Sequence, residues 1–221
     1  FLVQKLVRGA LGNNNIDNCA RICHSPTQFG MSATVGWGAA SQHFDSILRA
    51  NVIMVVGANP TEGHPVFGSL MKRRIREGAK LIVIDPRRTE TVDSAHCKAT
   101  LHLALRPGTN VAVLDSISHV IVREKLYNEE FIRARCEWEE FEVWMGLVGS
   151  DRYAPEVIGP QAGIDPEAIR QAARMYAGGP NSAIYYGLGV TEHSQGSTGV
   201  MCLGNLALAC GMLRQEGVGG P

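Results

Sequence analysis

Short runs of consecutive apolar residues alternate along the chain with longer segments in which apolar positions recur every three or four residues. Residues 52–56 (VIMVV) and 81–84 (LIVI) are the clearest continuous apolar runs. Such runs are typical of strands that are buried on both faces of a parallel sheet. Shorter apolar runs at 101–105 and 183–186 predict two further strands.

Segments with helical spacing follow these runs, at residues 64–77, 110–125, 165–177 and 198–213. The third opens with Asp165 as a capping residue and Pro166 in its first turn, which is a common helix start. Strands that alternate with helices favour right-handed crossovers between parallel strands. The sequence therefore predicts an α/β fold, with a Rossmann-like, mostly parallel sheet and helices on both faces, in three layers.

No internal repeat or low-complexity linker interrupts this pattern, which favours a single α/β domain over residues 1–221. Within it, residues 1–50 carry a Cys-His pair, and residues 51–221 contain the dinucleotide-type sheet and its helices. Residues 128–160 are richer in charge and tryptophan, and we expect them to form a helical insertion packed at one edge. Because the chain starts at Phe1 and ends in Gly-Gly-Pro, we expect a piece of a longer polypeptide.

Composition excludes some classes of function. The 21 basic residues balance 21 acidic ones, so charge gives no argument for binding nucleic acid or an acidic membrane. No apolar stretch approaches the roughly 18 residues that a membrane span needs. The six cysteines lack the spacing of a disulfide framework, which indicates free thiols in a reducing, cytoplasmic compartment.

Small, polar and charged residues follow each predicted strand, at 57–61, 85–88, 106–110 and 187–193. Ligands of such sheets bind at the carboxyl ends of the strands, where these four loops should meet. Asp85 after the second strand could bind a ribose hydroxyl, and the neighbouring Arg87 could bind a phosphate or a guanine. The first loop lacks the G-x-G-x-x-G pattern, and turn formers are common at strand ends in any protein. Four such loops at one edge nevertheless favour a nucleotide-like ligand.

The stretch CARICHSP, residues 19–26, raises several alternatives. A zinc site would need a second ligand pair, a disulfide between Cys19 and Cys23 would close a very small loop, and an iron–sulfur cluster would need more cysteines. Both cysteines could also be small apolar packing residues. The remaining alternative is a reactive thiolate at Cys23, favoured by His24 and by a helix that starts at the following Ser-Pro; it could serve as a nucleophile or as a ligand of a soft metal.

Residues 13–28, NNNIDNCARICHSPTQ, strongly resemble the active-site stretch of formate dehydrogenase alpha subunits in the molybdopterin oxidoreductase family. The segments GANPTEGHPV, IDPRRTETVDSA, LRPGTNVAVL, EAIRQAARMYA and GLGVTEHSQGS are similar to further family segments, in the same order. The resemblance implies oxidation of formate to carbon dioxide at a molybdenum or tungsten bis-molybdopterin guanine dinucleotide centre. It makes Cys23 the metal ligand and His24 the adjacent proton acceptor or substrate-positioning group.

The same resemblance implies that the strand-end loops hold the guanine dinucleotide form of the cofactor. The implied cofactor-binding residues are Asn59, Asp85, Arg87, Gly108, Asn110, Gly189, Glu192 and His193. Cys19 matches no ligand role and is interpreted as a packing residue. The other cysteines and His64, His96, His102 and His119 are interpreted as structural.

Family members also carry parts that we do not find in this sequence. The resemblance implies a 4Fe-4S cluster before this region, an Arg-Gly-Gln-Asn-Asn segment after it, and electron-transfer subunits with iron–sulfur or flavin centres, in some cases linked to NAD. We therefore expect the isolated chain to be inactive. Two alternatives remain open: a related pterin enzyme of nitrate reductase type, and a non-catalytic docking domain of a respiratory assembly.

Overall fold

Four parallel strands form the central sheet of the structure, a computed structural model that describes residues 1–39 and 41–213. Strand β1 (Val52–Val56) pairs with β2 (Lys80–Ile84) on one side and with β6 (Ser182–Tyr186) on the other, and β2 pairs with β5 (Leu101–Leu103). The resulting order is β5-β2-β1-β6. All four predicted strands are confirmed. Strand β5 is shorter than predicted because the Leu105 N–H donates to the Leu103 carbonyl oxygen, two residues earlier, in a local turn.

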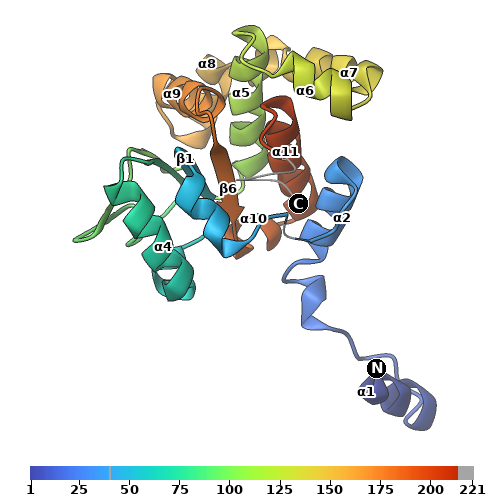
Figure 1. Ribbon diagram of the computed structural model, residues 1–221. Coiled ribbons are helices and arrows are strands. Elements are labelled where there is room, and N and C mark those ends of the chain that lie inside the picture. Colours follow the sequence, from blue (N-terminus) through green and yellow to red (C-terminus); the bar gives the residue numbers. More distant parts are fainter. Residues whose placement is uncertain (40, 214–221) are drawn as a thin grey trace.

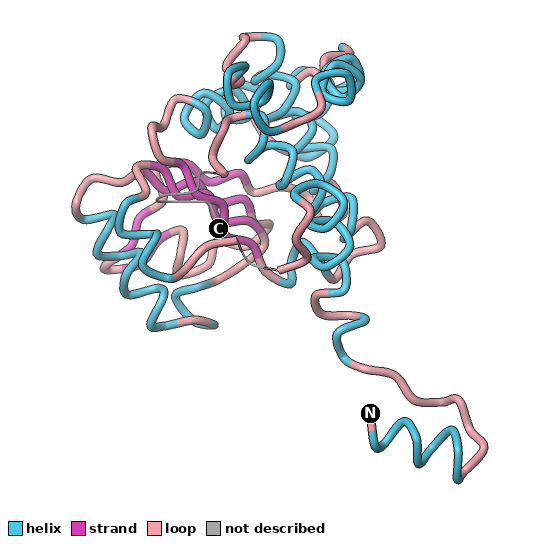
Figure 2. The backbone as a smooth tube through the Cα atoms, turned by 45° about the vertical axis from the view of Figure 1, so that its right-hand side comes forward, coloured by secondary structure: helices cyan, strands magenta, loops and turns pink. Residues whose placement is uncertain are grey.

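Helices cover both faces of this sheet (Figures 1 and 2). Helix α4 (Pro65–Arg76) packs on one face, and α5 (Asn110–Arg123), α9 (Pro166–Ala177) and α11 (Gly196–Ala209) lie on the other. Alternate residues of β1 enter the two cores: Ile53 and Val55 face α4, whereas Met54 and Val56 face α5 and its neighbours. The predicted three-layer α/β fold is confirmed.

The remaining elements are shorter or lie outside these layers. They are α1 (Leu2–Lys5), η1 (Leu6–Ala10), η2 (Cys19–Arg21), α2 (Ser25–Val35), η3 (Phe44–Arg49), α3 (Pro60–Gly63), β3 (Asp93–Ser94), β4 (Cys97–Lys98), α6 (Glu129–Arg135), α7 (Trp138–Val148), η4 (Asp151–Tyr153), α8 (Pro155–Ala162) and α10 (Leu188–Thr191). Strands β3 and β4 form a small antiparallel pair. Within the described residues, no helix is long and apolar enough to cross a membrane.

The segment 128–160 is helical, as expected, and forms α6, α7 and α8. These helices pack on α5, α9 and α11, and Phe141 of α7 lies among Tyr127, Trp138 and Trp144. The carboxyl end of α8 reaches the loop after edge strand β5, where Arg106 donates to the Pro160 and Gln161 carbonyl oxygens.

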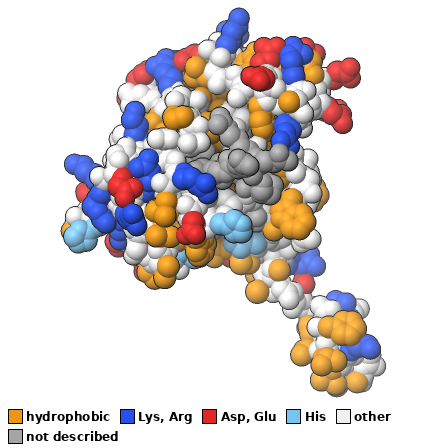
Figure 3. Space-filling model, viewed as in Figure 1, with side chains coloured by type: hydrophobic (Ala, Val, Ile, Leu, Met, Phe, Trp, Pro, Cys, Tyr) orange, Lys and Arg blue, Asp and Glu red, His pale blue; other side chains and the backbone are white. Residues whose placement is uncertain are grey.

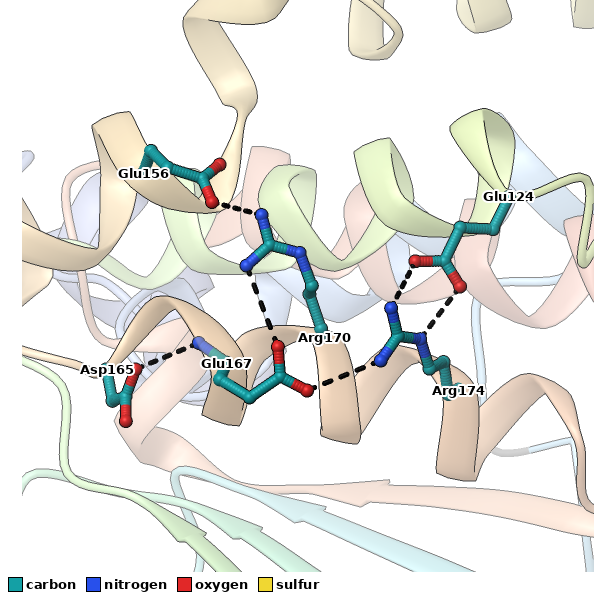
Figure 4. A network of polar contacts seen from close by, with 6 residues as sticks. All are labelled: Glu124, Glu156, Asp165, Glu167, Arg170 and Arg174. Atoms are coloured by element: carbon teal, nitrogen blue, oxygen red, sulfur yellow. Dashed lines mark hydrogen bonds and ion pairs between the residues drawn. The ribbon is translucent and has the colours of Figure 1, made fainter.

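Ion pairs on the outer surface attach α9 to its neighbours (Figure 4). Arg174 donates two hydrogen bonds of 2.8 Å to the Glu124 carboxylate at the end of α5. Arg170 forms an ion pair with Glu156 of α8. The Asp165 carboxylate accepts from the Glu167 N–H at 2.9 Å, so the predicted cap of this helix is confirmed.

Helices α2 and α11 pack closely and in parallel through two glycines. A Cβ on Gly30 would lie 2.8 Å from the Val200 Cβ, and one on Gly204 would lie 2.4 Å from the Thr34 Oγ1. Gly30 contacts Val200, and one turn later along both helices Thr34 contacts Gly204, so the two helices run in the same direction. Both helices therefore begin at the same end of the sheet.

The first residues form an arm that extends away from the body of the molecule (Figures 1 and 3). The arm consists of α1 and the π-helix η1, and neither contains a buried residue. Hydrophobic side chains concentrate on this arm, including those of Phe1 and Leu2, which are 88% and 79% exposed. The Gly-Gly-Pro sequence at 219–221, on which part of the fragment prediction rests, lies outside the described residues.

Candidate functional site

A cleft of about 840 Å³ lies at the carboxyl ends of the strands. The connections from β1 lead towards β2 and β5, whereas β6 is added on the opposite side of β1, so the strand order reverses between β1 and β6. Reversal points of this kind create the crevice in which α/β proteins bind their ligands. Eight of the predicted site residues line the cleft: Cys23, His24, Asn59, Asp85, Arg87, Asn110, Gly189 and His193.

Glycines allow the loops after β1 and β6 to touch through their backbones. A Cβ on Gly57 would lie 2.6 Å from the carbonyl carbon of Gly189, and Gly57 has a positive φ of 55° that favours glycine. The Gly189 N–H donates to the Gly57 carbonyl oxygen at 2.9 Å. The floor of the cleft is therefore bare backbone, which a flat or phosphorylated ligand can approach closely.

Cys23 and His24 stand at the start of α2, as the Ser-Pro sequence predicts. The Cys23 N–H donates to the Cys19 carbonyl oxygen in the turn of η2, and the Cys23 thiol is half-buried. His24 occupies the N-cap position, and its Nδ1 lies 3.0 Å from the Thr27 Oγ1. The Tyr186 hydroxyl, at the end of β6, donates to the same Thr27 oxygen at 3.0 Å. This chain of contacts ties the Cys-His segment to the sheet.

The loop after β2 presents a carboxylate and a guanidinium. Asp85 is buried, and one of its carboxylate oxygens accepts from the Arg87 N–H at 2.8 Å, which closes an Asx turn. The Asp85 carbonyl oxygen lies 2.9 Å from the His102 Nε2. The Arg87 side chain is exposed and forms no hydrogen bond or ion pair with any described residue, although its charge helps to lower the pKa of Glu90. Its guanidinium is therefore available to a ligand in the cleft.

Asn59 uses its side chain to join two loops. Its Nδ2 donates to Glu62 at 3.0 Å and to Glu90 at 2.8 Å, and its Oδ1 accepts from the Thr91 hydroxyl at 2.8 Å. A backbone hydrogen bond and the Asn59 amide hold the pKa of Glu90 below its ordinary value. Asn59 lines the cleft, yet within the protein it mainly fixes the loop after β1 against the loop after β2.

Gly108 and Glu192 are not among the residues that line the cleft. Gly108 has a φ of 88° and open space around it, and it lines a much smaller hollow of about 30 Å³ together with Asn110 and His193. Glu192 follows α10, whose single turn carries the chain away from the cleft before His193 returns to it.

The structure adds residues to the site that sequence reasoning did not assign. Glu62, His64, Tyr186 and Leu188 line the cleft. His64, interpreted above as structural, is exposed at the cleft and precedes α4. Its position after the first strand was the available signal. The structural interpretation fits His102, described above, and the buried His119, whose Nδ1 lies 3.0 Å from the Val148 carbonyl oxygen.

The interpretation of Cys19 as a packing residue is wrong, because its side chain is exposed. Cys19 lies in η2, a turn that projects between the arm and α2 and has no buried residue. By contrast, Cys97, Cys202 and Cys210 are buried, as a structural role requires. Burial raises the pKa of Cys210 to about 12, so this thiol stays protonated.

The cleft combines one accessible thiol with positive and neutral hydrogen-bond donors. No group of three or more His, Cys, Asp or Glu side chains that could hold a metal occurs in the described part of the chain. A metal at Cys23 would therefore take most of its ligands from another molecule. Helices α2 and α5 begin at the cleft, where their free N–H groups favour anions such as phosphate.

Comparisons with known proteins show similarity over nearly the whole chain. A family model described as molybdopterin oxidoreductase matches residues 1–220. Formate dehydrogenase H of Escherichia coli is 38% identical over 99% of this chain, and the F420-dependent formate dehydrogenase subunit alpha of Methanocaldococcus jannaschii is 39% identical over 99%. The chain spans only 30% and 31% of the length of these two relatives. Among solved structures, the acetylene hydratase from Pelobacter acetylenicus matches with a TM-score of 0.78 and 26% identity, over 94% of this chain and 27% of that protein.

Proposed function

Because this chain belongs to the molybdopterin oxidoreductase family, we propose that the protein containing it is a formate dehydrogenase that oxidises formate to carbon dioxide. The chain would form the central part of the catalytic subunit. The observation that carries the proposal is the Cys23–His24 pair at the mouth of a cleft where the strand order reverses. The similarity to formate dehydrogenases over 99% of the chain supports the choice of substrate.

The residues of the cleft fit a guanine dinucleotide form of molybdopterin. The cleft volume of about 840 Å³ lies in the upper part of the roughly 300–1,000 Å³ range of ligand pockets. The bare backbone at Gly57 and Gly189 suits close approach of a pyrophosphate, and the unpaired Arg87 suits a phosphate or a guanine edge. The lone thiol suits a molybdenum or tungsten ion whose other ligands are the sulfur atoms of two pterins.

Individual residues would divide this work. Asp85, Arg87, Asn110, Gly189 and His193 would hold the dinucleotide directly from the cleft wall. Asn59 would act by fixing the loop that carries it, and Gly108 and Glu192 would contribute from the rim. The described residues would provide one dinucleotide site, so the second pterin would be held by other parts of the protein.

Cys23 would be the protein ligand of the metal, and His24 would place the substrate beside it. When bound, the metal–pterin centre supplies the acceptor for the two electrons that leave formate. Reacting formate is a small anion, and carbon dioxide is neutral. Donors at the cleft, such as the imidazole of His24, would therefore orient the carboxylate and release the product once its charge is lost.

The remaining parts of the enzyme are proposed from the family. A 4Fe-4S cluster in a part of the protein outside this chain would take up the electrons and pass them to electron-transfer subunits, with iron–sulfur or flavin centres and in some cases NAD. The subunit name of the Methanocaldococcus relative agrees with such an assembly. The six cysteines of this chain are all free, which agrees with a reducing compartment and supports a cytoplasmic location.

The test is formate-dependent reduction of a viologen dye by the intact protein, purified with its metal. We expect Cys23→Ser to abolish turnover, because a hydroxyl is a poor ligand for a soft metal. Cys19→Ser is the matched control, since this exposed thiol lies one helical turn away and should be dispensable. Full activity of Cys23→Ser would refute the metal-ligand role. Nitrate is assayed in parallel, because a nitrate reductase of Symbiobacterium thermophilum is 29% identical to this chain; turnover of nitrate alone would overturn the choice of formate.

A further inference from the structure

A row of three hydrogen-bonding side chains leads from the sheet to the cleft. The Tyr186 hydroxyl at the end of β6 lies 3.0 Å from the Thr27 Oγ1, which in turn lies 3.0 Å from the His24 Nδ1. Tyr186 and His24 both line the cleft, and all three residues line an adjoining, mostly apolar cavity of about 520 Å³. The row therefore separates the two cavities and ends on the imidazole that stands beside Cys23.

The number of hydroxyl hydrogens in this row determines which residue donates each hydrogen bond. Thr27 has one hydroxyl hydrogen, and its oxygen has contacts with only Tyr186 and His24 among the described residues. If Tyr186 donates to Thr27, Thr27 donates to the Nδ1 of His24, and each hydroxyl hydrogen has an acceptor. In the reverse direction the hydroxyl hydrogen of Tyr186 has no acceptor in the described residues, which is unfavourable for a half-buried group. Burial also raises the pKa of Tyr186, so this phenol keeps its proton and remains a donor.

We propose that Thr27 and Tyr186 are positioning residues that hold His24 in the tautomer with hydrogen on Nε2. With Nδ1 occupied as an acceptor, the Nε2–H of His24 is the group left to donate to a small anion in the cleft. Resting on the proposed function, this inference identifies that anion as the carboxylate of formate. It assigns His24 the role of orienting the substrate.

Chemical labelling of His24 tests the tautomer directly. Diethylpyrocarbonate acylates an imidazole nitrogen through its free lone pair, and peptide mass spectrometry of the intact protein locates the product. We expect T27V to increase the labelling rate of His24 by roughly two- to ten-fold, the effect of one ordinary hydrogen bond. T27S keeps the hydroxyl and should label like the parent. His96 is exposed and has no hydrogen bond in the described residues, so its rate is the internal control for folding and reagent.

A second substitution tests whether Tyr186 acts through Thr27. Y186F should raise the labelling rate of His24 by less than T27V, and adding Y186F to T27V should have no further effect. In turnover assays, T27V should raise the KM for formate more than it lowers kcat, and T27S should restore the parent value. Equal His24 labelling in the parent, T27V and Y186F would overturn the positioning role. If labelling changes as expected while the parent does not oxidise formate, the positioning role stands and the proposed function fails.

Discussion

The contact between Gly57 and Gly189 allows a quantitative prediction about the stability of the protein. In Gly57→Ala, the new Cβ would lie 2.6 Å from the Gly189 carbonyl carbon and 2.9 Å from its Cα. Both are backbone atoms, so a side chain cannot simply rotate away and one loop has to move. The φ of 55° adds a separate penalty for any residue with a Cβ.

The two effects can be given separate magnitudes. A left-handed backbone conformation costs a non-glycine residue about 1–2 kcal/mol, and overpacking costs about 1–3 kcal/mol. We therefore expect Gly57→Ala to lower the free energy of unfolding by about 2–5 kcal/mol. Because the displaced loops form the floor of the cleft, the same variant should also bind its cofactor less well.

Two control substitutions separate the causes. Gly108 has a φ of 88° but open space around it, so Gly108→Ala should show only the backbone penalty of about 1–2 kcal/mol. Gly146 of α7 has neither problem, and Gly146→Ala should be neutral or stabilise by up to about 1 kcal/mol. The assay is equilibrium denaturation in urea, in which a shift of the midpoint at constant slope reports stability. Equal losses in Gly57→Ala and Gly108→Ala would refute the argument that the two loops are in hard contact.

Two further predictions concern charge and thiol reactivity. Glu124→Gln should lower the denaturation midpoint at neutral pH, because the hydrogen bonds and charge of Arg174 hold the pKa of Glu124 below its ordinary value. This contribution is present above the pKa of the unfolded carboxyl and is lost as the pH falls through the folded value. The parent and the variant should therefore converge in acid, and a constant difference would contradict the ion pair. A thiol reagent should modify the exposed Cys19 rapidly. It should modify the buried Cys202 and Cys210 only after unfolding, since burial raises the pKa of both thiols. Rapid loss of all six thiols under native conditions would contradict the burial of Cys202 and Cys210.

Much of the fold follows from the apolar pattern because continuous apolar runs have few alternatives to a buried parallel strand. Residues 52–56 and 81–84 are buried throughout, as the sequence predicts. The edge strand β5 is less regular: the apolar run 101–105 predicts five residues, and the structure has three. At an edge, the partner on one side is missing, so local turns can end a strand early.

Side chains in the cleft were less predictable than the loops that carry them. Chain order places residues at the carboxyl ends of strands, which located Asp85 and Arg87 correctly at the cleft. It does not give the direction of a turn, so Glu192 was expected at the cleft although α10 carries it away. Tyr186 and Thr27 are 159 residues apart, and no local pattern links them. Cys19 was expected to pack because cysteines usually do, and nothing in its neighbours reveals that η2 lacks a covering layer.

The glycine contacts between α2 and α11 have a mechanical consequence. Cys23 and His24 precede the first turn of α2, and the His193 carbonyl oxygen accepts from the first N–H of α11. Because the backbone of each helix touches a side chain of the other, at Gly30 and at Gly204, we expect the two helices to shift together. We therefore expect the backbone segments that carry Cys23, His24 and His193 to keep their spacing when the two helices move. We expect widening of the cleft to admit a large ligand to occur instead at the exposed Arg87 loop, which follows β2 and lies outside this pair of helices.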